Sequence, residues 1–368
     1  MPKKAPHLAA GILGFLLLAS MTLLLVVLAF VGSLGTSVIP ALVLLAALIG
    51  LVWAMAAEWP SVFKAAPGWL WAPRNINLFL AVFGGTLVTY YLSAHVGLGA
   101  VVAASLVAII AALVLPAYEV PIYCGAFVGM SCPSVYVSLG SISVAGALGG
   151  AVYVIVQMAF NGFGGKLGTI AFISCVLPVV VGGRGFRVPG DPPELALGLQ
   201  IVACAVVAAV ATYVVSIRFK HGAVMGSGIV GMIAGLLLPN LMMANGGLLA
   251  VVAICASFAG MSSPERVRNE LLLALGGVLT GVIFIYSDPF MGGAGGKLGT
   301  IAFASVIAVS GLRSMILLGW TKVRSMRESM CVEEATAPGT PLGSGGDAKD
   351  SSTNFDTHQE APAQVKEW

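Results

Sequence analysis

Apolar residues dominate the chain in long runs, which short clusters of glycine, proline and charged residues separate. A run of about 18 or more apolar residues can cross a bilayer as a helix, because the hydrocarbon core is roughly 30 Å thick. The pattern therefore predicts an all-α polytopic membrane protein with about twelve transmembrane helices. The twelve expected spans cover about residues 8–31, 35–57, 75–94, 97–116, 120–137, 138–159, 167–183, 195–217, 222–239, 244–262, 270–288 and 298–318.

The fifth span, residues 120–137, is the weakest, and a re-entrant element is the alternative to a full crossing there. If all twelve spans cross and the N-terminus is cytoplasmic, most lysines and arginines of the short loops fall on the cytoplasmic side, as the positive-inside rule requires. Only Arg184, Arg187 and Lys297 are left outside. We therefore expect an integral plasma (inner) membrane protein with both termini in the cytoplasm.

Two segments of the chain repeat each other. The string GGKLGTIAF begins at Gly164 and again at Gly295, an offset of 131 residues. At the same offset GAFVGMSCP, from Gly125, matches ASFAGMSSP. At an offset of 123, GAVVAASLVAIIAALVLP, from Gly99, matches GAVMGSGIVGMIAGLLLP at nine of eighteen positions. Three matched blocks in the same order indicate an internal duplication.

The duplication divides the chain into two leading helices in residues 1–60, repeat 1 in residues 75–183 and repeat 2 in residues 195–318. Each repeat holds five expected spans, and an odd number turns the second copy upside down in the membrane. The predicted fold is thus two leading helices and a 5+5 inverted-topology repeat. Such repeats are typical of secondary transporters and some channels, with the solute site where the copies meet. The expected solute site is thus inferred by analogy with such folds.

Each copy carries a Gly-x-Gly-Gly-Lys motif directly before an apolar helix. Glycine allows a partner to approach the backbone closely, and a helix start adds unpaired amides and partial positive charge. With a lysine beside it, the motif suits an anion, and a threonine three residues later can add a hydroxyl. The expected substrate-binding residues are Gly164, Gly165, Lys166 and Thr169 in repeat 1 and Gly295, Gly296, Lys297 and Thr300 in repeat 2.

A purely structural role for this motif is the alternative. Glycine-rich segments turn the chain and let helices pack closely, and a lysine can extend its ammonium group to the lipid headgroups. Two features favour a binding role. Lys297 falls on the outside, against the charge rule, and the nine-residue identity exceeds what a turn requires.

Asp288 lies nine residues before Lys297, and Gln157 holds the equivalent position in repeat 1. Ionisable groups at membrane depth are costly and usually functional. Asp288 and Gln157 are therefore candidate ion-coupling positions for H⁺ or Na⁺, and Asp288 is also a candidate partner of Lys297. An ordinary acidic residue at a helix end, before Pro289, is the alternative.

A Gly-Met-Ser-x-Pro element ends one span in each copy, with its serine at Ser131 and Ser262. Proline breaks a helix, and serine can satisfy the freed backbone groups. The element therefore predicts either a discontinuous helix that lines the solute path or a plain helix stop.

Composition limits the remaining possibilities. Hydrophobic residues make up 58% of the chain and charged residues 9%, far from the about 25% charged residues of a soluble domain. The net charge of +3 comes with no basic stripe for nucleic acid. No CxxC spacing or histidine cluster suggests a metal, and no cofactor motif occurs. Residues 330–368 are rich in Gly, Pro, Ser, Thr and acidic residues and are expected to form a disordered cytoplasmic tail.

Three functions fit these features. The first is a secondary transporter, or permease, for a small anionic solute, coupled to H⁺ or Na⁺, as a monomer or a homo-oligomer. The second is a passive channel for a small solute. The third is a membrane-embedded enzyme or assembly subunit that acts on lipid-linked phosphate substrates, although the lack of clustered acids and histidines counts against it.

Overall fold

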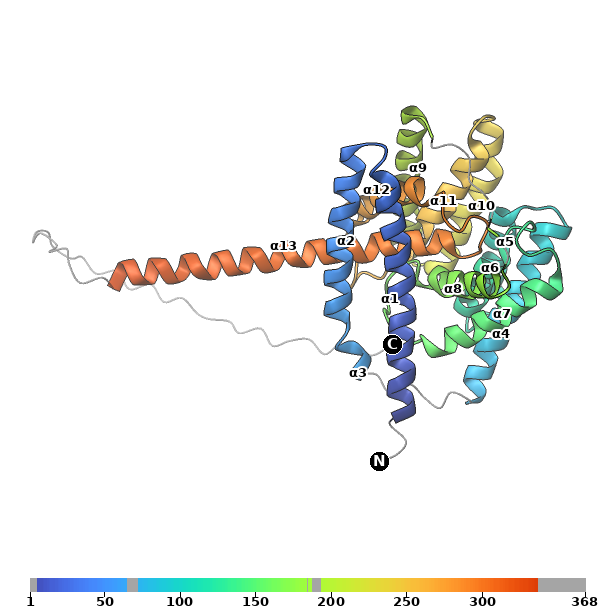
Figure 1. The fold of residues 1–368 in the computed structure, drawn as a ribbon, viewed down its shortest axis with the longest axis horizontal. Helices are drawn as coiled ribbons and strands as arrows, with labels where there is room; N and C mark the ends of the chain where they lie inside the picture. The colour runs from blue at the N-terminus through green and yellow to red at the C-terminus, as the bar shows by residue number, and fades with distance from the viewer. Residues whose placement is uncertain (1–4, 65–71, 184, 187–192, 337–368) are drawn as a thin grey trace, which may run out of the picture. The chain divides into compact units, whose positions relative to one another are not determined.

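The computed structural model describes residues 5–64, 72–183, 185–186 and 193–336, and this part of the chain is built from helices (Figure 1). Residues 1–319 form one unit and residues 320–368 a second. The helices are α1 (Ala5–Ser33), α2 (Val38–Glu58), α3 (Ser61–Lys64), α4 (Pro73–Tyr90), η1 (Tyr91–His95), α5 (Ala100–Val114), α6 (Glu119–Gly129), α7 (Leu139–Ile155), α8 (Lys166–Val181), α9 (Leu195–Tyr213), η2 (Val214–Arg218), α10 (Ala223–Leu241), α11 (Gly246–Gly260), α12 (Glu270–Ser287) and α13 (Lys297–Thr336).

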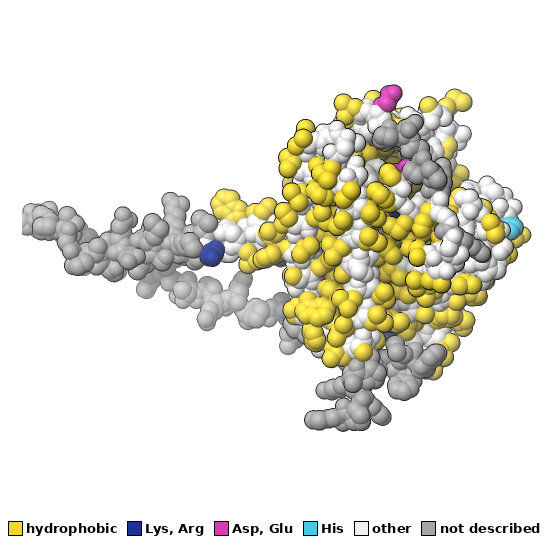
Figure 2. All heavy atoms as spheres, in the orientation of Figure 1, with side chains coloured by type: hydrophobic (Ala, Val, Ile, Leu, Met, Phe, Trp, Pro, Cys, Tyr) yellow, Lys and Arg dark blue, Asp and Glu magenta, His cyan; other side chains and the backbone are white. Residues whose placement is uncertain are grey.

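Seven of the described helices are long and apolar enough to cross a membrane. Large hydrophobic side chains such as Leu13, Ile39 and Leu199 are exposed on the unit formed by residues 1–319, and Figure 2 shows such side chains over most of its visible face. An exposed apolar surface of this extent suits lipid rather than water. The prediction of a helical membrane protein is therefore confirmed, and each of the twelve expected spans overlaps a described helix.

The fifth expected span differs from the prediction. Helix α6 ends at Gly129 rather than near residue 137, and its 11 residues cover only about 16 Å at 1.5 Å per residue. Residues 130–138 continue as turns and irregular chain. Pro133 cannot continue a helix because it lacks a backbone N–H. Non-helical chain at membrane depth is tolerated where it is buried in protein or lines a cavity.

The last expected span, residues 298–318, is the start of α13. Over residues 297–319, α13 crosses α1 and α2 and does not run parallel to them (Figure 1). It continues through residues 330–336, where composition predicted disorder. The rest of the expected tail, residues 337–368, lies outside the described residues, as do Arg184 and Arg187 of the loop-charge prediction.

Pairs of residues that are separated by 123 or 131 positions, the offsets of the matched blocks, share backbone features. Helices α4 and α9 both end in a π-helical turn, η1 and η2. The Tyr90 hydroxyl donates to the carbonyl of Tyr136, and the equivalent Tyr213 hydroxyl donates to the carbonyl of Val267 at 2.8 Å. Positive φ angles recur in five pairs, Gly97 with Lys220, Gly99 with Gly222, Phe160 with Met291, Gly162 with Gly293 and Gly165 with Gly296.

Helix α1 contacts equivalent places in the two copies. Gly14 lies against Ile155 at the end of α7, and Gly32 lies against Tyr286 at the end of α12. Ile155 and Tyr286 are 131 residues apart in the sequence. Along α1, the separation from Gly14 to Gly32 is about 27 Å at 1.5 Å per residue. The ends of α7 and α12 therefore lie about as far apart as the thickness of a hydrocarbon core.

Helices α8 and α13 begin at the centre of the unit formed by residues 1–319, and they cross there with their backbones in contact. A Cβ atom added at Gly168 would overlap the Cα of Gly299, and one added at Gly299 would overlap the Cα of Gly168. Gly165 and Gly296, the residues before the two helices, have φ of 83°, which favours glycine. The shared GGKLG string thus meets a packing requirement at the crossing of the two copies.

We expect G168A and G299A each to lower the free energy of unfolding by about 1–3 kcal/mol, because the added methyl group must displace a facing backbone. G84A is the matched control, since a Cβ at Gly84 meets no atom within 4 Å. Chemical unfolding of the purified protein in detergent measures the difference. Equal stability of G168A and G84A would contradict the crossing.

Candidate functional site

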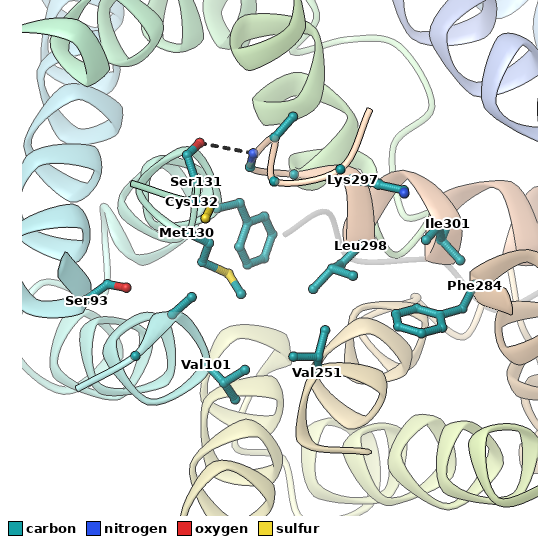
Figure 3. A pocket seen from close by; sticks show the side chains of 18 of the residues that line it. Ser93, Val101, Met130, Ser131, Cys132, Val251, Phe284, Lys297, Leu298 and Ile301 are labelled. Carbon is teal, nitrogen blue, oxygen red and sulfur yellow. Dashed lines mark hydrogen bonds between the residues drawn. The ribbon is translucent and has the colours of Figure 1, made fainter. Parts of the chain in front are cut away.

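The serine of each Gly-Met-Ser-x-Pro element binds the glycine-rich loop of the other copy. The Oγ atom of Ser131 accepts a hydrogen bond from the N–H of Gly295 at 3.0 Å (Figure 3). The Oγ atom of Ser262 accepts one from the N–H of Gly164 at 3.1 Å. Two backbone bonds of 2.9 Å support them, from Cys132 to Gly293 and from Ser263 to Gly162. Each copy therefore holds the loop of the other through equivalent bonds.

The same serine hydroxyls also end the short helices. Ser131 donates to the carbonyl of Val128, and Ser262 donates to the carbonyl of Ala259, both at 2.7 Å. Each buried hydroxyl thus satisfies one helix-end carbonyl and one loop amide. The Gly-Met-Ser-x-Pro element is both a helix stop and a contact between the copies.

Each motif lysine binds the end of the helix that precedes it. The ammonium group of Lys297 donates to the backbone carbonyl of Asp288 at 3.1 Å. The ammonium group of Lys166 donates to the backbone carbonyl of Gln157 at 3.0 Å. A cation is favourable at a helix C-terminus, where carbonyl groups lack partners. Lys297 is 7% exposed, so its ammonium group stays inside the protein.

The surroundings of the two lysines differ in one respect. Lys166 has a second acceptor, the Oδ1 atom of Asn161, at 2.9 Å. The equivalent position in repeat 2 is Gly292, which has no side chain. In the described part of the chain, the ammonium group of Lys297 makes its one hydrogen bond with the Asp288 carbonyl, and it forms no ion pair within 4.0 Å.

Two cavities adjoin the two glycine-rich loops. Cavity 1, of about 740 Å³, adjoins the loop of repeat 2, and cavity 2, of about 470 Å³, adjoins the loop of repeat 1. Figure 3 shows Lys297 and Ile301 on one side of cavity 1 and Met130, Ser131 and Cys132 on the other. Equivalent residues line both, namely Tyr153, Gln157, Lys166, Leu167, Ile170 and Met261 in cavity 2 and Phe284, Asp288, Lys297, Leu298, Ile301 and Met130 in cavity 1.

The cavities lie at opposite ends of α4. Cavity 2 is lined by Arg74, in the first turn of α4, whereas cavity 1 is lined by Ser93, in η1 at its other end. Helix α4 and η1 together have 23 residues, which correspond to about 34 Å. The two cavities also lie at opposite ends of α5. Ala100, the first residue of α5, lines cavity 1, and Ala117, just after the end of α5, lines cavity 2.

A buried aromatic cluster, formed by Tyr123, Phe127 and Phe258, lies at the boundary of the cavities. Phe127 lines both. Its ring centroid is 4.3 Å from that of Tyr123 and 4.3 Å from that of Phe258. The three side chains are at most 1% exposed. Phe127 and Phe258 belong to the matched blocks GAFVGMSCP and ASFAGMSSP. The repeat therefore contained both residues, although neither was among the predicted site residues.

The predicted site residues divide between the cavities. Gly295, Gly296, Lys297 and Asp288 line cavity 1, and Gly164, Gly165, Lys166 and Gln157 line cavity 2. The two threonines line neither cavity. Thr300 donates to the carbonyl of Gly296 at 3.3 Å, and the buried Thr169 hydroxyl has no hydrogen-bond partner among the described residues. The two lysines therefore do not share one site.

One further interaction ties a leading helix to this region. Arg266 forms an ion pair with Glu58 at the end of α2 and donates from Nε to the carbonyl of Asn161 at 2.9 Å. Its guanidinium carbon lies 4.3 Å from the ring centroid of Phe163. Repeat 1 has Val135 at the equivalent position, so this anchor exists at the loop of repeat 1 alone.

No match was found when the chain was compared with protein-family models, with curated proteins and with solved structures. Among the described residues, no group of three or more His, Cys, Asp or Glu side chains is placed to hold a metal ion.

We expect S131A and S262A each to lower the free energy of unfolding by about 1–3 kcal/mol, because each leaves a buried backbone N–H without its acceptor. S134A is the control, since Ser134 is exposed. Chemical unfolding in detergent measures the change. A loss in S131A no larger than in S134A would show that the bond to Gly295 does not hold the copies together.

Proposed function

We propose that this chain is a secondary transporter for a small anionic solute, and that its path connects cavity 1 and cavity 2. One observation carries the proposal: equivalent residues line two cavities at opposite ends of α4, and Phe127 lies at both. A pair of equivalent vestibules around a buried barrier suits alternating access, in which one side opens while the other closes.

The proposal includes a 5+5 inverted repeat. Support comes from α1, which contacts the equivalent ends of α7 and α12 about 27 Å apart. If α1 crosses the membrane, these equivalent ends lie near opposite faces, as inversion requires. This placement of the two ends does not depend on how many helices cross the membrane, and so it does not depend on the short α6.

The proposal keeps the plasma (inner) membrane and cytoplasmic termini, and loop contacts agree with the span count behind this orientation. The loops that contain Glu58, Asn161 and Arg266 are all expected on the cytoplasmic side from the span count. Arg266 contacts both of the other residues. Cavity 2 would then face the cytoplasm and cavity 1 the outside, where Cys132 pairs with Gly293.

The anionic character of the solute rests on the motif lysines. Each cavity has one lysine beside a glycine-rich loop and a helix start, a combination that favours negative charge. Asp288 lines cavity 1 where Gln157 lines cavity 2. An ionisable acid at this position in one copy only suits coupling to H⁺ or Na⁺.

The alternatives predict different behaviour. A passive channel would use the same path, but the buried aromatic cluster closes it, which favours a carrier. An enzyme or assembly subunit for lipid-linked phosphates would require acid and base groups. The charged residues that line cavity 2 are Arg74, Glu119 and Lys166, so this alternative would have Glu119 as its carboxylate there.

Uptake into proteoliposomes tests the proposal. Reconstituted protein should take up a small anion with saturation, and a proton or sodium gradient should drive accumulation. F127A should add a leak that neither saturates nor follows the gradient, because it removes the aromatic side chain that lines both cavities. Unsaturated flux in the unchanged protein would favour the channel. No flux together with a tightly bound lipid would favour the enzyme.

A further inference from the structure

The two motif lysines are not equivalent as ligand-binding groups. A lysine ammonium group has three N–H donors. Lys166 directs them at two acceptors, the Gln157 carbonyl and the Asn161 side chain. Lys297 has one acceptor among the described residues, the Asp288 carbonyl. Lys297 therefore has donors left for a ligand in cavity 1.

Cavity 1 also contains a charge of the opposite sign. Its charged lining residues are Lys297 and Asp288. The Asp288 side chain is exposed, and its carboxylate and the Lys297 ammonium group are not paired within 4.0 Å. The cavity thus offers one cationic and one anionic group with no net charge. The equivalent Gln157 in cavity 2 is neutral.

This arrangement selects a chemical class of ligand. A buried ammonium group is costly unless an anion or further acceptors satisfy it. A doubly charged anion such as sulfate would meet Lys297 but would be repelled by Asp288. A solute with a carboxylate and an ammonium group can satisfy both, through two charge-assisted hydrogen bonds. Apolar lining residues such as Val101, Val251 and Phe284 can contact its side chain.

We propose that cavity 1 binds a zwitterionic amino acid, with its carboxylate on Lys297 and its ammonium group near Asp288, and that Lys166 takes no part in this binding. The binding site is independent of transport. Its role in uptake rests on the proposed function, with the anionic group of the solute being a carboxylate that an ammonium group of the same molecule balances.

A thermal-shift screen of the full-length protein in detergent tests the ligand class, because a ligand bound only by the folded state raises the melting temperature. Each common amino acid is measured beside the matching carboxylic acid without the amine and the matching amine without the carboxylate. At least one amino acid should stabilise the protein at a concentration where neither matched compound does. Stabilisation by the acid alone, or by no amino acid, would overturn the proposal.

Variants test the residues. K297Q and D288N should each weaken binding of that amino acid at least tenfold. G292N should also weaken it, because it offers Lys297 the acceptor that Asn161 offers Lys166. N161G is the matched control in the other copy and should leave affinity within twofold. Equal losses in K166Q and K297Q would overturn the assignment, and D288N and G292N keep it testable if K297Q does not fold.

The outcomes separate this site from the proposed function. Amino-acid binding without uptake in proteoliposomes would keep the site and reject transport. Uptake of an anion without amino-acid binding would keep transport and reject this site.

Discussion

The contact between Gly168 and Gly299 is the constraint on which the rest of the structure depends. No side chain fits between the two backbones, so α8 and α13 cross at their first turns. This crossing brings each glycine-rich loop against the Gly-Met-Ser-x-Pro element of the other copy, within reach of Ser131 and Ser262. The lysines, the two cavities and the aromatic cluster all take their places around that crossing.

The two copies share a backbone but differ in the side chains that give each cavity its properties. Asp288 and Gly292 surround Lys297, whereas Gln157 and Asn161 surround Lys166. The ion pair of Arg266 with Glu58 anchors the loop of repeat 1 to a leading helix. A symmetric frame allows two similar end states, and these substitutions make the two sides chemically different.

Much of the fold was predictable from local features. Apolar runs located the helices, and the shared GGKLGTIAF string located both loops. The early end of α6 was partly visible in the Gly-Met-Ser-x-Pro element, where Ser131 donates to the carbonyl of Val128. The second bond of this hydroxyl, from the N–H of Gly295, was not visible, because Gly295 is 164 positions away in the sequence. The separation of Lys166 from Lys297 was not predictable either. Both motifs suggested one site, and only the crossing of the two copies places them in separate cavities.

The two threonines show the same limit of prediction from the sequence. Thr169 and Thr300 follow the lysines at a spacing that suited a hydroxyl in the site, but their helices turn them into the protein interior. Phe127 and Phe258 were present in the matched blocks without a chemical signature, because an aromatic side chain in an apolar run is ordinarily core. Their position at the boundary of the cavities depends on contacts between elements far apart in the sequence.

Side-specific thiol labelling tests the central claim, that equivalent loops lie on opposite sides of the membrane. Asn161→Cys and Gly292→Cys are made in a background without the six native cysteines and exposed in intact cells to a membrane-impermeant reagent, then in inverted vesicles. Gly292→Cys should react only from outside and Asn161→Cys only from the cytoplasmic side. Labelling of both from the same side would contradict it.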